Sequence, residues 1–242
     1  MRKWSVLLCY VLWMFQCSCS ALRSFVIQPG GVKGFYMTGI CKYIRDHYDL
    51  SDWNYYGASA GAWNVMYLGC KPEKEELFIQ QAQEIGQFSY TSLYDMEKTM
   101  KQRLIVNFKL EDFNIPSMNI CVSSKRNWQP LLRKEVIREF YDMDDLVECC
   151  IASSHLPFIT NGEFFYHYRA RKCLDGGFFR KPYTREDNVI PSMILYPEIW
   201  KNTQMNQINR MHTLDIHTVS YTHLRAHETG RNLVWPLVVL KK

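Results

Sequence analysis

The sequence predicts an α/β protein in which a mainly parallel sheet is covered by helices on its faces. Short runs of β-branched and aromatic residues alternate with longer segments whose apolar residues recur at helical spacing. Glycine-rich turns separate the first strands from the helices that follow them, an order typical of parallel strands joined by crossover helices. The chain has 242 residues, of which 47% are apolar, so it is long enough to bury a core.

The first elements follow this alternation in order. Residues 22–28 form an aromatic and β-branched run that predicts a buried strand, and the breaker cluster Pro29-Gly30-Gly31 ends it. Apolar residues at helical spacing predict a helix over residues 34–48. A second short strand is predicted at 53–56 and, after a turn of small residues, an apolar helix at 62–68.

More helices and the outer strands are predicted in the rest of the chain. Pro72 and the acidic residues after it are typical of a helix start. The predicted helices cover residues 72–85, 95–108, 131–141 and 143–153, and the predicted strands cover residues 117–124, 164–168, 170–174 and 189–196. Because no internal repeat and no low-complexity linker interrupts this order, we expect one domain.

The N-terminal segment, residues 1–20, has the pattern of a secretory signal peptide. Arg2 and Lys3 precede a mostly apolar run over 4–15, and the small residues Ser18 and Ser20 stand before Ala21. The run is shorter than the ~20 residues of a membrane-spanning helix. The segment predicts entry into the secretory pathway or secretion. The alternatives are an uncleaved amphipathic anchor, which would associate with a membrane, and a mis-called start codon.

The C-terminal segment, residues 219–242, begins VSYTHLRAHET, which looks like a translated sequencing adapter. We therefore expect it to be adapter read-through rather than native sequence, a genuine tail being the alternative. The native domain is then residues 21–218. Four basic residues and one acidic residue lie in 219–242 and two basic residues in 1–20, so the 29 basic and 24 acidic residues of the chain leave 23 of each in the domain. This balance argues against a nucleic-acid-binding protein.

Six cysteines lie in residues 21–218, and none forms a C-x-x-C pair. Neither a zinc site nor a redox motif is therefore indicated, and we expect most of these cysteines to be small buried hydrophobic residues. They are Cys41, Cys70, Cys121, Cys149, Cys150 and Cys173.

The turn between the second predicted strand and its helix, Gly57-Ala58-Ser59-Ala60-Gly61, fits the pattern G-x-S-x-G. A tight turn of this kind exposes a serine hydroxyl at the edge of a sheet, and the following helix N-terminus supplies partial positive charge. Ser59 is therefore the candidate nucleophile. A glycine-containing turn with an inert serine is the alternative.

A second glycine cluster, Gly30-Gly31-Val32-Lys33-Gly34, lies between the first strand and the first helix. Backbone amides in such a cluster form a concave site for an anion, which could be a phosphate, a pyrophosphate or a transient oxyanion. The spacing fits neither the dinucleotide motif nor the P-loop. With a serine nucleophile nearby, we favour an oxyanion hole over an ordinary turn.

A third cluster, Asp175-Gly176-Gly177, follows a predicted strand. A carboxylate at a strand end can act as general base toward a serine hydroxyl, although Asp-Gly-Gly is also a common turn.

Together the three clusters resemble the patatin-like phospholipase family, lipid acyl hydrolases related to the catalytic domains of cytosolic phospholipase A2. That family has a glycine-rich oxyanion loop, a G-x-S-x-G elbow one βα unit later and a D-G-[GA] segment. Residues 152–158, ASSHLPF, also resemble its A-S-x-x-x-P-x-F segment. Two departures are Pro29, which stands where the loop usually has its first glycine, and residues 178–182, which lack the usual asparagine.

The resemblance implies a three-layer α/β/α fold and a lipid acyl hydrolase that uses no cofactor and no metal ion. It implies that Ser59 is the nucleophile, Asp175 the general base, and Gly30 and Gly31 the oxyanion hole. The further motif residues are Lys33, Gly34, Gly57, Gly61, Gly176 and Gly177. The implied partner is a glycerolipid at a lipid or membrane surface, with no nucleic acid and no obligate protein partner.

Three alternatives remain open. An α/β-hydrolase would complete a triad with His212 or His217, which follow Asp175 in the order that this fold requires. A non-catalytic lipid-binding module or a nucleotide-binding domain would leave Ser59 inert. The aromatic residues around the elbow are either core residues or the wall of an acyl-chain site. They are Trp53, Tyr55, Tyr56, Trp63 and Tyr67.

Overall fold

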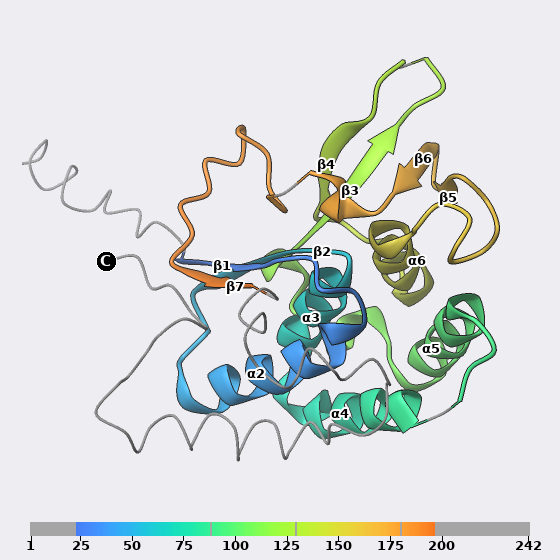
Figure 1. Cartoon of the computed structure of the whole chain (residues 1–242). Coiled ribbons are helices and arrows are strands. Elements are labelled where there is room, and N and C mark those ends of the chain that lie inside the picture. Colours follow the sequence, from blue (N-terminus) through green and yellow to red (C-terminus); the bar gives the residue numbers. More distant parts are fainter. Residues whose placement is uncertain (1–22, 88, 129, 180, 197–242) are drawn as a thin grey trace, which may run out of the picture.

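The computed structural model describes residues 23–87, 89–128, 130–179 and 181–196. They form a central sheet flanked by helices, so the predicted α/β class is confirmed (Figure 1), and the arrangement is consistent with a three-layer α/β/α fold. The predicted signal peptide and the expected adapter-derived segment lie outside the described residues. No helix within the described ranges is long and apolar enough to cross a membrane.

The parallel part of the sheet is built from four strands in the spatial order β7, β1, β2, β3. They are β1 (Arg23–Ile27), β2 (Trp53–Ala58), β3 (Met118–Lys125) and β7 (Met193–Leu195). Residues of both faces of β1 and β3 are buried, as expected for parallel strands covered on both sides. The predicted strands at 22–28, 53–56 and 117–124 are therefore confirmed.

The rest of the sheet is antiparallel, so the sheet is mixed. Strands β4 (Arg133–Ile137) and β6 (Arg171–Leu174) both pair with β3, and β5 (Tyr166–Tyr168) pairs with β6. Cys121 pairs with both β2 and β4, and Ser123 pairs with both β4 and β6. Because a strand has only two edges, β2 and β6 share one edge of β3 and run toward each other along it.

Five α-helices are described. They are α2 (Gly34–His47), α3 (Ala60–Gly69), α4 (Pro72–Gln87), α5 (Leu93–Asn107) and α6 (Met143–Ser154). Each was predicted within a few residues, and α5 and α6 begin at the capping residues Ser92 and Asp142, whose side chains accept backbone N–H groups. In Figure 1, α2 and α3 lie against the strands β1 and β2, and α4 lies beyond them.

The prediction of a helix at residues 131–141 is wrong, because residues 133–137 form the strand β4. The apolar residues here recur at helical spacing, but the exposed edge of β3 offers backbone groups that an antiparallel strand satisfies. Side chains reinforce the pairing: Glu135 accepts a hydrogen bond from Ser124 at 2.9 Å and forms an ion pair with Arg171. The strand predicted at 189–196 is also shorter than expected, since Pro191 cannot donate to the ladder.

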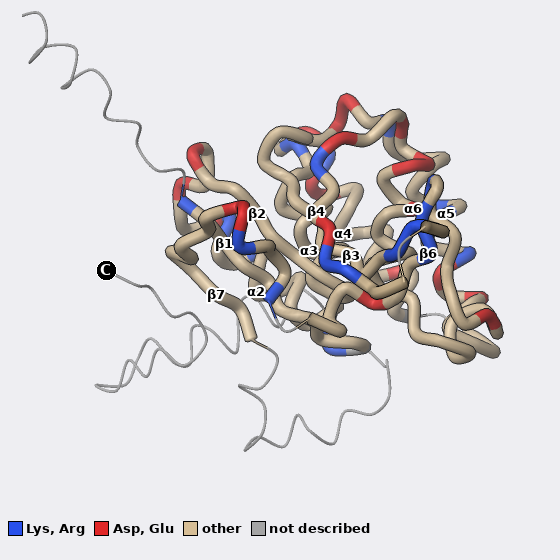
Figure 2. Tube along the Cα trace, turned by 90° about the horizontal axis from the view of Figure 1, so that it is seen from above, with Lys and Arg blue, Asp and Glu red and all other residues tan. Residues whose placement is uncertain are grey.

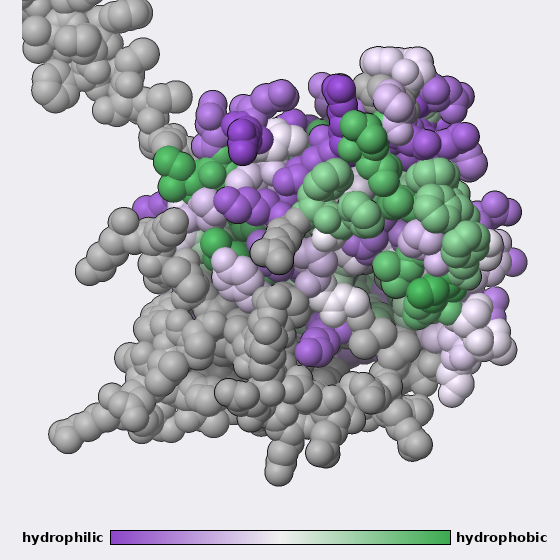
Figure 3. Space-filling view, turned by 45° about the horizontal axis from the view of Figure 1, so that its top comes forward, coloured by the Kyte–Doolittle hydropathy of each residue, from purple (hydrophilic) through white to green (hydrophobic). Residues whose placement is uncertain are grey.

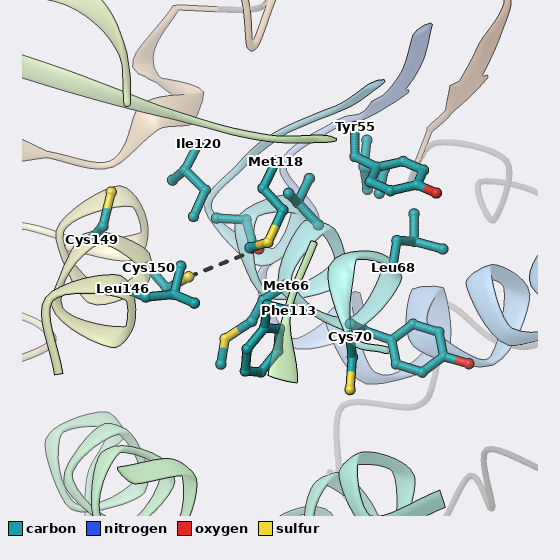
Figure 4. Close-up of a cluster of buried hydrophobic side chains, with 14 of the residues drawn as sticks. Tyr55, Met66, Leu68, Cys70, Phe113, Met118, Ile120, Leu146, Cys149 and Cys150 are labelled. Carbon is teal, nitrogen blue, oxygen red and sulfur yellow. Dashed lines mark hydrogen bonds between the residues drawn. The ribbon is translucent and has the colours of Figure 1, made fainter. Parts of the chain in front are cut away.

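The core lies between β3, α3 and α6 (Figure 4). Met66, Met118, Ile120 and Leu146 are fully buried there, together with Cys149 and Cys150. All six cysteines between Cys41 and Cys173 are free and buried, which confirms their predicted role as small hydrophobic residues. Burial raises the pKa of these thiols, so they remain protonated and unreactive at neutral pH.

Charged residues of both signs occur along the described part of the chain. Figure 2 shows Lys and Arg interspersed with Asp and Glu along the trace. Several form ion pairs across elements, such as Lys101 with Asp144 at 2.8 Å and Arg45 with Glu75 at 3.1 Å. Basic and acidic side chains are thus paired with one another at several places on the described part of the chain.

Candidate active site

Ser59 lies at a sharp turn between the end of β2 and the start of α3. Its backbone has φ 55° and ψ −127°, a conformation that residues other than glycine rarely adopt. Its N–H donates to Ser153 Oγ at 2.9 Å, and Ser153 in turn donates to Cys121 O at 2.6 Å. The strained turn is thus held by side-chain contacts from α6, which is typical of a functional position.

The two glycines of the motif allow this turn by letting strand and helix approach closely. A Cβ at Gly57 would lie 2.2 Å from Gly61 O, and a Cβ at Gly61 would lie 2.4 Å from Ile27 O. Both distances are far shorter than van der Waals contact, and both neighbours are backbone atoms that cannot rotate away. The G-x-S-x-G motif is therefore required by packing as well as by the position of Ser59.

We expect Gly57→Ala to destabilise the fold by about 1–3 kcal/mol, the usual cost of forcing a methyl group into a packed site. Gly86→Ala in α4 is the matched control, because the nearest atom to its added Cβ is Phe35 Cδ1 at 4.0 Å. Alanine there should leave stability unchanged or raise it. Thermal unfolding followed by circular dichroism compares them, and equal midpoints for the two variants would contradict the packing argument.

Asp175 meets Ser59 because of the sheet topology. Strand β2 ends with Ala58 beside Cys121, and β6, running the other way along the same edge of β3, ends with Leu174 beside Ser123. The next residues are Ser59 and Asp175, so the two strand ends present them to each other. The Asp175 carboxyl lies close enough to the Ser59 hydroxyl for that hydroxyl to lower its pKa.

The carboxylate of Asp175 is held in one orientation. Its Oδ1 accepts the N–H of Gly177 at 2.6 Å, and the Asp175 N–H donates to His155 O at 2.8 Å. Burial raises the pKa of Asp175, while its hydrogen bonds with Ser59 and Gly177 oppose this shift. A raised pKa makes the carboxylate a stronger proton acceptor, as a general base requires.

The glycine loop lies beside this pair. Gly31 begins the short 3₁₀ helix η1 (Gly31–Lys33) at φ 55°, and a Cβ there would meet no atom within 4 Å. Gly31 and Ser59 line the same cavity. Among the described residues, nothing accepts a hydrogen bond from the Gly30 or Gly31 amide. Gly31, whose amide has no acceptor among the described residues, therefore lies at the wall of this cavity.

The other motif residues are structural in this arrangement. A Cβ at Gly34 would lie 2.9 Å from Ala60 Cβ, and a Cβ at Gly176 would lie 2.1 Å from Cys121 O. A Cβ at Gly177 would lie 2.6 Å from Pro29 Cγ, so Pro29 packs against the loop that carries Asp175. Lys33 is half-buried and forms no ion pair with another described residue.

A cavity of about 190 Å³ extends from Ser59 and Gly31 toward α4 and α5. Its far wall is mostly apolar and comes from residues that the sequence analysis had not assigned to a site: Phe78, Ala82, Ile85, Leu93, Met96, Met100 and Leu104. The sequence did contain a signal for this wall, because Met96, Met100 and Leu104 recur every four residues on one side of α5. The same spacing fits ordinary core packing, so it did not distinguish the two roles.

The aromatic residues near the elbow divide between the two expected roles. Trp63 lines the cavity, and its Nε1 donates to Ser154 Oγ at 3.2 Å. Trp53, Tyr55 and Tyr67 are core residues. Tyr56 packs edge-on against Tyr183. Trp53, Tyr55 and Tyr67 thus follow the core-packing interpretation, and Trp63 is the member of the cluster that lines the cavity.

The buried histidine near Asp175 is His155. Its Nδ1 lies 2.6 Å from Thr160 Oγ1, and burial lowers its pKa, so the ring is neutral at pH 7. The ring is thus engaged with Thr160, as a packing residue would be. His212 and His217, the candidate triad residues, lie outside the described residues. The described part of the chain contains no cluster of three or more His, Cys, Asp or Glu residues suited to a metal ion.

Comparison with known proteins gives little further information. No model of a known protein family matches the chain, and no curated protein matches it. Among solved structures, the crystal structure of VipD from Legionella pneumophila is similar at 12% identity and a TM-score of 0.34, covering 72% of this chain. This chain spans about half, 49%, of the length of that one. A similarity at this level does not assign an activity.

Proposed function

We propose that the protein is a lipid acyl hydrolase that uses Ser59 as nucleophile and Asp175 as general base. The observation that carries the proposal is the juxtaposition of Ser59, on its strained turn, with the half-buried Asp175 carboxyl, whose pKa it lowers. The pair lies at one end of a largely apolar cavity, which suits an acyl chain. The cavity and the pair together favour an ester of a fatty acid over a small polar ester.

In this mechanism, Ser59 Oγ attacks the ester carbonyl carbon while Asp175 accepts the hydroxyl proton. The negative charge that develops on the carbonyl oxygen is stabilised by the amides of Gly30 and Gly31. The tetrahedral intermediate collapses, the alcohol leaves with the proton from Asp175, and an acyl-enzyme forms at Ser59. Water, deprotonated by Asp175, then attacks the acyl carbonyl and releases the fatty acid.

A stopped-flow assay with nitrophenyl octanoate tests this reaction. An acyl-enzyme predicts a burst of nitrophenol equal to the enzyme concentration, followed by slower turnover. Release of fatty acid from phosphatidylcholine vesicles, measured by mass spectrometry, extends the test to a lipid. Binding of fatty acid without a burst or release would instead identify a non-catalytic lipid-binding module.

The substrate is expected at a lipid surface, because the loop at the cavity mouth is apolar. Leu156 and Thr160 line the cavity, and between them Phe158 and Ile159 are 66% and 62% exposed. Phe158 packs against the exposed Phe164 with ring centroids 5.5 Å apart. Figure 3 shows hydrophobic residues gathered on one face of the described part. Large exposed apolar side chains of this kind commonly mark interaction sites.

The double variant Phe158→Ser, Ile159→Ser should separate docking from catalysis. We expect about a tenfold loss of hydrolysis on vesicles, since two large side chains no longer bury apolar area in the lipid. Hydrolysis of a short soluble ester should remain near the wild-type rate. Sedimentation with vesicles measures the docking itself, and unchanged sedimentation would contradict this assignment of the loop.

A further inference from the structure

The apolar cavity contains a carboxyl group that the proposed reaction does not use. Glu97 in α5 lines the cavity among Met96, Met100 and Leu104, and it is only 8% exposed. Gln81 in α4 also lines the cavity and is 7% exposed. Glutamate is rarely buried to this extent without a partner, because desolvating it is costly.

No described residue forms a hydrogen bond or an ion pair with Glu97. Lys101, one turn further along α5, instead pairs with Asp144 at 2.8 Å and with Glu148. Gln81 accepts a hydrogen bond from Arg103 through Oε1 at 3.2 Å, which leaves its amide N–H groups as donors. The cavity thus offers hydrogen-bonding groups that the described protein does not satisfy.

The charge state of Glu97 follows from its surroundings. Burial raises its pKa to about 8, and the negative charge of Glu148 on α6 adds to this shift. Glu148 itself is held by Lys101 and by the hydroxyl of Tyr166 on β5. At pH 7 Glu97 is therefore mostly a neutral carboxylic acid, which both donates and accepts hydrogen bonds.

We propose that Glu97, assisted by Gln81, binds an uncharged hydroxyl group carried by the acyl chain, so that the preferred substrates are esters of hydroxylated fatty acids. The proposal rests on the proposed hydrolase function and assigns Glu97 as its specificity-determining residue. A hydroxyl group satisfies both the donor and the acceptor of a carboxylic acid without adding charge. A plain chain leaves the carboxyl unsatisfied, at a cost that the substrate must offset.

The test compares nitrophenyl esters of ω-hydroxyacyl and unsubstituted acyl chains from hexanoyl to hexadecanoyl. The wild type should prefer the hydroxylated ester by about tenfold in kcat/KM at the length that reaches Glu97, as one hydrogen bond allows. Glu97→Leu should abolish the preference and improve the plain ester, whereas Glu97→Gln should retain most of it. Glu73→Leu on the exposed side of α4 is the matched control and should behave as wild type.

The pH dependence of kcat/KM adds a second measurement, which would not change if the role of Glu97 were only structural. As pH rises through about 8, Glu97 ionises and the plain chain must pack against a buried charge. The kcat/KM of wild type for the plain ester, relative to that of Glu97→Leu, should therefore fall, while the hydroxylated ester should be affected less.

Measuring ligand binding to the Ser59→Ala protein tests the role of Glu97 independently of the hydrolase proposal. Methyl esters of the two acids should displace a fluorescent fatty acid with the same order of preference, and they should do so even if no ester is cleaved. Equal affinities and equal kcat/KM at every chain length would overturn the proposal. A stronger preference for an ω-ammonium chain would also overturn it, by identifying a cation site.

Discussion

Ser59→Ala should lower the hydrolysis of nitrophenyl octanoate by roughly 10⁴-fold or more, as loss of the nucleophile does in serine hydrolases. Alanine cannot form the acyl-enzyme, so the burst should also vanish. The fold should persist, because the N–H that donates to Ser153 Oγ belongs to the backbone and remains. Circular dichroism checks the fold, and the kinetic measurement is kcat/KM with the burst amplitude.

The matched control for this variant is Ser51→Ala. Ser51 is exposed in the turn before β2 and contributes its backbone N–H to Asp49 at 3.0 Å, so its hydroxyl is dispensable. We expect Ser51→Ala to show the same kinetics as the wild type, whereas Ser59→Ala should show no burst. A Ser59→Ala protein that still hydrolyses the ester with a burst would place the nucleophile elsewhere.

Asp175→Asn should lower kcat/KM by roughly 10²–10⁴-fold, the contribution of a positioned general base. The amide cannot accept the Ser59 proton, and its NH2 group would face the N–H of Gly177 unless the side chain turns over. In the proposed mechanism, activity requires the ionised carboxylate. The rate should therefore fall at acid pH, and because burial raises this pKa the fall should begin at a higher pH than for an exposed aspartate.

The same assay separates the dyad from the triad. His212→Ala and His217→Ala should each change kcat/KM by less than about tenfold, since in the proposed dyad no imidazole accepts a proton during turnover. Asp46→Asn, at an exposed position of α2, controls for loss of a carboxylate. A collapse of activity in either histidine variant with its fold retained would favour the α/β-hydrolase triad.

Elements with strong local signals were predictable from the sequence. The turn at Ser59 follows from Gly57 and Gly61, whose steric requirement lies within a few residues of the strand and helix that they join. The capped helices α5 and α6 carry their start signals in Ser92 and Asp142. In contrast, β4 forms because β3 presents a free edge. The residues of β4 alone do not indicate this pairing, because the partner strand is not a local feature of the sequence.

The candidate site was predictable in part. Ser59 and Asp175 could be named from their motifs, but their contact depends on β2 and β6 meeting along one edge of β3, which only the topology reveals. The cavity wall on α4 and α5 could not be separated from core packing by periodicity. The burial of Glu97 could not be predicted, since a glutamate in an amphipathic helix normally lies on the solvent side.

The most direct measurement is the mapping of a fluorophosphonate adduct on the full chain. The reagent reacts with serines activated by a base and an oxyanion site, so it reports the nucleophile without any choice of substrate. We predict one adduct per chain, located by peptide mass spectrometry on Ser59 and absent from both Ser59→Ala and heat-denatured protein. An adduct on another residue, or no adduct on folded protein that hydrolyses esters, would contradict the assignment of Ser59.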